Sequence, residues 1–292
     1  MQPIIVHFSL GEARPSLLPP RFRPAEVAEV FKVTRVEHLG TGGFGDTWLL
    51  EDGSTRKFAK VLSEPQYPLI LVEREVKGLL RAASPRVVTL LGVEKVAFSD
   101  GPRIVLFFEY IEGHDVLARI KAGDWPTEPE VLAFAVGLFE GLAALHAVGA
   151  VHRDLKPANI ALRHSGWDEP VILDLGLAKL LDESTITSYP AVLGTLPYMA
   201  PEQLRGDRAR KAADLWAVGI VLHLLLAQEH PFYGAEPLDQ EAAVARLLEG
   251  PRPLPPDVGE PLRSLTRRLL SPKPHERGGA VRALRELEVV RG

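Results

Sequence analysis

The 292-residue sequence contains no cysteine. This absence excludes disulfide bonds and any chemistry that depends on a thiolate. A chain without cysteine fits a reducing compartment, and we expect a cytoplasmic protein.

Long hydrophobic runs are missing as well. No apolar run reaches the roughly 18 residues that a membrane-spanning helix needs. The longest candidate, residues 217–227, is interrupted by His223 and is better explained as a buried helix. No cationic segment precedes the short apolar stretch near the N-terminus, so we expect no signal peptide.

The sequence also lacks a strong charge of either sign. Its net charge of -4 gives no electrostatic reason to expect nucleic acid or an anionic membrane as the main partner. Hydrophobic residues make up 46% and charged residues 25%, a balance typical of globular rather than disordered chains. The length allows one large two-lobed domain or two small ones.

Residues 1–30 differ from the rest of the chain. Four prolines and three arginines lie between Ala13 and Pro24, which predicts an extended arm or tether. Residues 4–8 fit a short strand added to a sheet edge, or equally a partly ordered leader.

Two kinds of pattern follow along the chain. From Phe31 to about Glu109 the pattern is mostly that of strands, with a hairpin signal at Asp52-Gly53 and one helix at about 68–83. Beyond Asp115 the periodicity predicts helices at 131–147, 212–227, 239–248, 261–270 and 279–290.

The most informative motif is VHRDLKPAN, residues 151–159, followed fifteen residues after its asparagine by Asp174-Leu175-Gly176. Phosphoryl transfer needs a carboxylate to orient a hydroxyl, a cation for developing charge and oxygen ligands for a hard metal ion. The HRDxKxxN run with its DLG turn resembles the catalytic loop and metal-binding turn of eukaryotic-type (Hanks-type) Ser/Thr protein kinases.

The resemblance covers roughly residues 31–290. It implies an α+β, two-lobed protein-kinase fold, with a small β-rich N-lobe at 31–109 and a larger helical C-lobe at 112–290, after an extension at 1–30. It also implies transfer of the γ-phosphate of ATP to Ser/Thr hydroxyls of protein substrates, with Mg²⁺ as the metal ion.

The resemblance assigns roles within these motifs. Asp154 orients the substrate hydroxyl and accepts its proton, and Lys156 stabilises the transferring phosphoryl group. Asn159 and Asp174 bind Mg²⁺, whereas His152 is a packed structural residue. A fold that kept these residues only as a scaffold is the alternative.

A glycine-rich segment, Leu39 to Gly45, carries GxGxxG between two predicted strands. Glycine lets backbone N–H groups approach phosphate oxygens, and a following strand argues against a dinucleotide-binding fingerprint, which needs a helix. Fifteen residues further on, Lys60 occupies the position that holds the α- and β-phosphates in the family.

Lys60 should pair with a helix glutamate, Glu73 or Glu75. At 100° per residue Glu75 lies nearer the apolar stripe formed by Val72, Val76, Leu79 and Leu80, and Arg74-Glu75-Val76 matches the family pattern. The sequence therefore predicts Glu75 as the partner of Lys60.

The expected adenine site departs from the family pattern. Phe58 stands where the roof residue is usually Ala, and Ala161 stands where the floor residue is usually a larger aliphatic. We hypothesise a compensating exchange of volume. The resemblance implies that Phe108 narrows the rear of the pocket and that backbone groups of Glu109 and Ile111 bind adenine. The expected nucleotide-binding residues are Gly40, Thr41, Gly42, Gly43, Phe44, Gly45, Thr47, Phe58, Lys60, Glu109, Ile111, Asp115 and Ala161.

Residues 174–202 resemble an activation segment that ends in GTxxYxAPE. Lys156 and Thr195 together form the Ser/Thr signature, and Glu202 should form a buried ion pair with Arg277. Residues 184–188 hold four hydroxyl side chains, and Arg153 is placed to receive a phosphate there, so we predict autophosphorylation within this stretch.

Two other functions stay open on the sequence alone. A pseudokinase would bind partners or nucleotide without catalysis, and Phe58 is its best support. A kinase acting on a small molecule is disfavoured by Thr195 and Pro201-Glu202. The oligomeric state and the physiological substrate cannot be read from the sequence.

Overall fold

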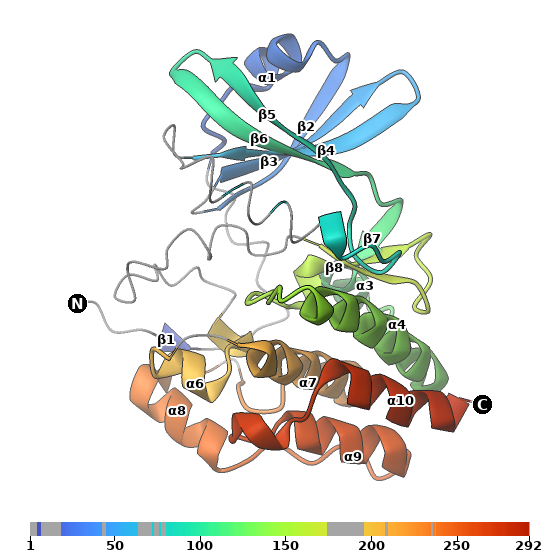
Figure 1. Ribbon diagram of the computed structural model, residues 1–292. Helices are drawn as coiled ribbons and strands as arrows, with labels where there is room; N and C mark the ends of the chain where they lie inside the picture. The colour runs from blue at the N-terminus through green and yellow to red at the C-terminus, as the bar shows by residue number, and fades with distance from the viewer. Residues whose placement is uncertain are drawn as a thin grey trace.

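The computed structural model describes residues 5–6, 19–42, 45–63, 72, 76, 80–173, 196–207, 210–234, 236 and 238–291. A sheet-rich lobe stands above a helical lobe in Figure 1. This arrangement follows the predicted order of strands first and helices second.

The N-lobe is built on a five-stranded antiparallel sheet. From one edge to the other its strands are β2 (Arg35–Gly42), β3 (Gly45–Asp52), β4 (Thr55–Leu62), β6 (Gly101–Glu109) and β5 (Leu90–Phe98). Gly53, with φ of +58°, closes the tight turn between β3 and β4, as the Asp52-Gly53 pair predicts.

The two faces of this sheet pack against different hydrophobic clusters. Trp48 and Leu50 on β3 and Ala59 on β4 belong to an outer cluster that also holds Phe22 and Val27. Because side chains alternate along a strand, Thr47 and its cross-strand partner Lys60 lie on the opposite, inner face. The inner face therefore carries three of the predicted nucleotide-binding side chains, those of Thr47, Phe58 and Lys60.

The predicted boundary between the extension and the kinase domain falls inside a helix. Helix α1 (Pro24–Phe31) crosses residue 30, and Val27 is fully buried against the outer face of the sheet. In Figure 1 this helix lies over the sheet, away from the helical lobe. Residues 19–30 are therefore part of the N-lobe.

Strand β1 (Ile5–Val6) agrees with the predicted strand at 4–8. It pairs antiparallel with β10 (Leu238–Asp239) and lies beside α8 of the C-lobe. The described N-terminal segments thus contact both lobes.

The helix predicted at 68–83 is described in part. Residues 72, 76, 80 and 81 are helical, and Val72 is buried. Leu80, however, is 60% exposed, so its assignment to the buried stripe was wrong.

The C-lobe is mainly helical. Its long helices match the predicted ranges to within a few residues. Its described elements are β7 (Gly113–Asp115), α3 (Val116–Lys121), α4 (Glu128–Ala147), η1 (Pro157–Asn159), β8 (Ile160–Arg163), β9 (Pro170–Ile172), η2 (Leu196–Tyr198), α6 (Pro201–Leu204), α7 (Lys211–Ala227), β10, α8 (Gln240–Leu248), α9 (Glu260–Leu269), η3 (Pro274–Glu276) and α10 (Ala280–Arg291).

Helices α4 and α7 form the centre of this lobe, and most of their residues are buried. Glu130 accepts hydrogen bonds from the backbone and hydroxyl of Thr127, both at 2.7 Å, and so fixes the start of α4. These bonds lower the pKa of Glu130. Among the described residues, α4 alone is long and apolar enough to span a bilayer, but 61% of that stretch is buried in the lobe.

Candidate active site

The catalytic loop is held by one buried carboxylate. Asp214, on the first turns of α7, accepts hydrogen bonds from the backbone N–H groups of His152 (2.9 Å) and Arg153 (2.8 Å). His146, near the end of α4, lies 2.8 Å from the same carboxylate. Arg153 has a φ of +67°, a conformation that an L-residue rarely adopts without such fixed partners.

His152 is structural, as predicted, and its tautomer follows from its bonds. The backbone N–H of Asp154 donates to Nδ1 at 3.2 Å, so Nε2 carries the proton and donates to the carbonyl of Leu173 at 2.7 Å. The ring is fully buried. It links the catalytic loop to the residue immediately before Asp174.

Three predicted catalytic-loop residues come together around one oxygen. Lys156 Nζ lies 3.1 Å from Asp154 Oδ2, and Asn159 Nδ2 lies 3.2 Å from the same atom. Asn159 Nδ2 also donates to the backbone carbonyl of Asp154 at 2.7 Å. Because Nδ2 makes both bonds, the amide oxygen of Asn159 is turned away from Asp154.

The glycine-rich hairpin occupies the tip of β2 and β3. Gly42 pairs with Gly45, and Gly40 pairs with Thr47. Gly45 has a φ of +151°, and an added Cβ there would meet the carbonyl oxygen of Val61 at 2.1 Å. Glycine is required at this position because the backbone of β4 approaches so closely.

Phe58 lies at the meeting point of the two lobes. It is the cross-strand partner of Phe108 and packs against a cluster that includes Ile111, Ala161 and Val171. The ring of Tyr110 lies 5.4 Å from that of Phe58. The expected roof and floor residues, Phe58 and Ala161, therefore belong to one apolar environment.

The segment that joins the lobes is anchored by Glu109. Its carboxylate accepts bonds from the backbone (2.9 Å) and hydroxyl (2.8 Å) of Thr89 and faces Arg163 of the C-lobe at 3.4 Å. Ile111 is buried. The backbone N–H of Glu109 also donates to the carbonyl of Thr89 at 3.0 Å. The role of the Glu109 and Ile111 backbone in adenine binding stays a prediction.

Asp115 has a local role that the sequence reading missed. Its Oδ1 accepts the N–H of Ala118 at 2.8 Å and caps α3. It also pairs across strands with Ala161, which places it beside the predicted floor of the adenine site.

Several predictions lie outside the described residues. These are the assignments of Gly43, Phe44, Glu75 and Asp174, the signature at Thr195 and the phosphorylation sites at 184–188.

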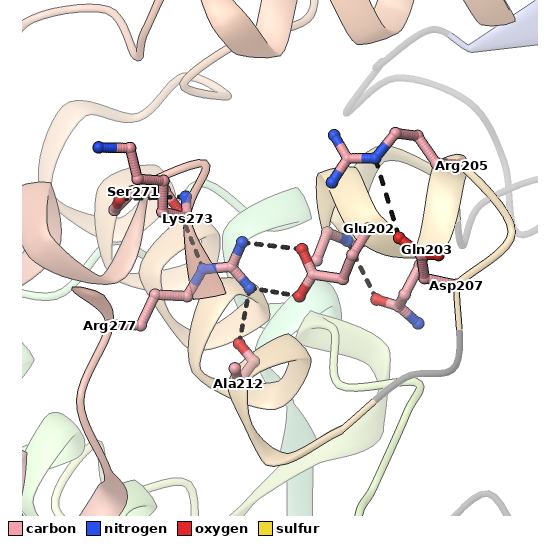
Figure 2. A network of polar contacts seen from close by, with 9 residues as sticks. Glu202, Gln203, Arg205, Asp207, Ala212, Ser271, Lys273 and Arg277 are labelled. Carbon is pink, nitrogen blue, oxygen red and sulfur yellow. Dashed lines mark hydrogen bonds and ion pairs between the residues drawn. The ribbon is translucent and has the colours of Figure 1, made fainter. Parts of the chain in front are cut away.

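The predicted ion pair between Glu202 and Arg277 is present and buried (Figure 2). Arg277 donates to both carboxylate oxygens, at 2.6 and 2.9 Å. It also donates to the carbonyls of Ala212 (2.9 Å) and Ser271 (2.8 Å). The pair joins the end of the predicted activation segment to the segment between α9 and α10.

A second contact, also to the end of the predicted activation segment, was not predicted. His230 Nε2 donates to the carbonyl of Pro197 at 3.0 Å, while Nδ1 accepts the N–H groups of Phe232 and Tyr233. Burial lowers the pKa of His230 to about 3, so the ring is neutral.

These features define the class of the protein. A model of the family described as "Protein kinase domain" matches residues 33–287, and the chain belongs to this family. The prediction of a Hanks-type Ser/Thr protein kinase is thereby confirmed.

The particular relatives carry the same designation. The chain is 31% identical over 248 residues to a probable serine/threonine-protein kinase, PkwA, of Thermomonospora curvata, covering 83% of this chain and 32% of the relative. It is 34% identical over 219 residues to the serine/threonine-protein kinase PkaA of Streptomyces coelicolor, covering 74% and 39%. The chain thus spans about a third of the length of these relatives, and they give no support to the pseudokinase alternative.

A solved structure confirms the predicted two-lobed fold. Rad53 residues 1–466 in complex with AMP-PNP match with a TM-score of 0.68 at 24% identity, over 85% of this chain and 62% of that one. At this level of identity the likeness establishes the fold alone.

Proposed function

We propose that this chain is an active Ser/Thr protein kinase that transfers the γ-phosphate of ATP to hydroxyls of protein substrates. The observation that carries the proposal is the convergence of Lys156 and Asn159 on one oxygen of Asp154. Membership of the protein kinase domain family and the names of the relatives support it.

The chain's own groups contribute positioning and part of the charge stabilisation. Asp154 accepts the hydrogen bond of the substrate hydroxyl and then its proton. Lys156 balances the charge of the carboxylate and that of the phosphoryl group in transit. Two donors hold the Asp154 carboxylate, so little reorganisation is needed when the substrate hydroxyl arrives.

Mg²⁺ is part of the proposal. The orientation of Asn159 fits this ion, because its amide oxygen is the atom type that a hard cation selects and neither bond to Asp154 uses it. Asn159 would hold the ion together with Asp174. Bound there, Mg²⁺ would neutralise phosphate charge.

The test is transfer of labelled phosphate from ATP to a Ser/Thr peptide library, with Asp154→Asn as the inactive variant and the exposed Asp257→Asn as the matched control. We expect transfer by the wild type and by Asp257→Asn, loss in Asp154→Asn, and loss on chelation that Mg²⁺ reverses. Equal signals from the wild type and Asp154→Asn would refute the proposal. Transfer to metabolites but not to peptides would favour a small-molecule kinase.

A cytoplasmic location belongs to the same proposal. It is consistent with the sequence, which has no cysteine. Cell fractionation tests it, and recovery of the protein outside the cytoplasmic fraction would contradict it.

A further inference from the structure

A buried carboxylate lies beside the phosphate-binding hairpin and has no role in the mechanism above. Asp46 directly follows Gly45 and is only 1% exposed. Its Oδ2 accepts the backbone N–H of Arg21 at 2.8 Å, and its Oδ1 accepts the hydroxyl of Thr41 at 2.8 Å. A buried carboxylate requires such donors, so Arg21 and Thr41 are fixed relative to β3.

A β-bulge makes this arrangement possible. The register between β2 and β3 shifts between His38 and Gly40, which leaves Leu39 as an extra residue. Without the shift, His38 and Thr41 would point to opposite faces, because side chains alternate along a strand. With it, His38 Nε2 lies 2.9 Å from Thr41 Oγ1 and donates to it, since the hydroxyl proton goes to Asp46.

Residue 21 is held by the packing that surrounds α1. Phe22 is buried and stacks on Phe98 with ring centroids 4.3 Å apart. Glu26 accepts the N–H of Ser99 at 2.9 Å, and Val27 is fully buried in the outer cluster. Arg21, which donates its N–H to Asp46, thus belongs to a segment that packs on the outer face of the sheet.

We propose that residues 19–31 position the phosphate-binding hairpin through Asp46, which acts as a positioning residue for ATP. The Asp46 side chain lies on the outer face, opposite Thr47 and Lys60, so it does not contact the nucleotide. Its bonds to Arg21 and Thr41 hold the strand ends that present Gly40, Gly42 and Gly45. The segment precedes residue 33, where the family match begins, and the inference rests on the proposed kinase function.

The experiment changes one partner of these hydrogen bonds at a time in the full chain, first the donor and then the acceptor. Arg21→Pro deletes the N–H that reaches Asp46, and Arg21→Ala is the matched control that keeps this N–H. Asp46→Asn retains the size of the side chain but leaves one of the two donors facing an amide NH₂ group. The double variant of Arg21→Pro and Asp46→Asn tests whether both changes act on the same bond.

We expect the KM for ATP to rise about three- to tenfold in Arg21→Pro and in Asp46→Asn. The KM for the peptide should stay at the wild-type value, Arg21→Ala should behave as the wild type, and the double variant should be no worse than the more affected single one. Amide hydrogen exchange should accelerate at 40–42 and 45–47 but not in α4. A merely structural role would instead change both KM values and exchange throughout the lobe.

Two results would overturn the inference. One is an unchanged KM for ATP in both single variants, and the other is a parallel rise in the KM for peptide. If the wild type transfers no phosphate, the proposed function fails instead. ATP binding by calorimetry, together with the hydrogen exchange, then decides the role of Asp46 on its own, because unchanged binding and exchange in both variants would refute it.

Discussion

Breaking the Glu202–Arg277 pair from either side should lower the free energy of unfolding by about 3–5 kcal/mol. The Arg277 side chain is 0% exposed and that of Glu202 is 10% exposed, so water does not replace a lost partner. Arg277→Met leaves a buried carboxylate and also two carbonyls, of Ala212 and Ser271, without their donor. For a domain of this size the loss corresponds to a fall in Tm of about 6–20 °C.

The loss in the free energy of unfolding can be measured by urea unfolding of three variants: Glu202→Gln, Arg277→Met and the double variant Glu202→Leu/Arg277→Met. The double variant should be less destabilised than the sum of the two single changes, because it leaves no unpaired buried charge. Arg267→Met is the matched control: its side chain is 72% exposed and 3.9 Å from Glu260, so the change should stay within about 0.5 kcal/mol. Single variants that lose less than about 1 kcal/mol would refute the reasoning, since that is the value of an exposed pair.

Three further predictions concern the base site, acid stability and activation. If the volumes of Phe58 and Ala161 compensate, Ala161→Leu should weaken ATP binding measured by calorimetry; tighter binding by Phe58→Ala with a harmless Ala161→Leu would contradict compensation. Burial lowers the pKa of His230 to about 3 in the folded chain, whereas in the unfolded chain the ring protonates near its ordinary pKa of about 6.5. The neutral ring therefore contributes its full share to the free energy of unfolding above about pH 6.5. Below that pH the free energy of unfolding falls by up to about 1.4 kcal/mol per pH unit towards pH 4. Urea unfolding of His230→Gln should therefore show a shallower loss on acidification than the wild type, and parallel curves would argue against the buried neutral ring. Replacing all four hydroxyl residues at 184–188 with Ala should abolish autophosphorylation in this stretch and reduce activity, as judged by phosphopeptide mapping and peptide kinetics; full activity would remove that prediction.

The long helices of the C-lobe could be predicted because their apolar residues repeat with the helical period. Helix α1 could not, because the prolines before it and at its first position suggested an extended arm. Pro24 stands at the first helical position, where the missing N–H is not needed. The helix depends on the burial of Val27 against a sheet formed later in the chain, and no local pattern reports that contact.

In the site, too, residues that are close in the sequence could be predicted, whereas contacts between distant residues could not. Asp154, Lys156 and Asn159 lie in one continuous run, so their chemistry and spacing could be recognised together. The bond from Arg21 to Asp46 and the bond from His230 to Pro197 join residues whose separation along the chain carries no signal. Asp115 has a local role that the sequence did not reveal, since its Oδ1 caps α3, and its predicted contact with the nucleotide stays a prediction.

The dependence of the catalytic loop on Asp214 has a consequence during synthesis on the ribosome. The carboxylate that holds the backbone of His152 is translated 62 residues after it. Until α7 has left the exit tunnel and docked, the catalytic loop lacks the two hydrogen bonds that Asp214 accepts from the backbone of His152 and Arg153. A nascent chain that stops before this point holds the complete HRDxKxxN motif without the carboxylate that fixes its backbone. If the chain is the proposed kinase, we expect phosphotransfer only after the C-lobe has assembled.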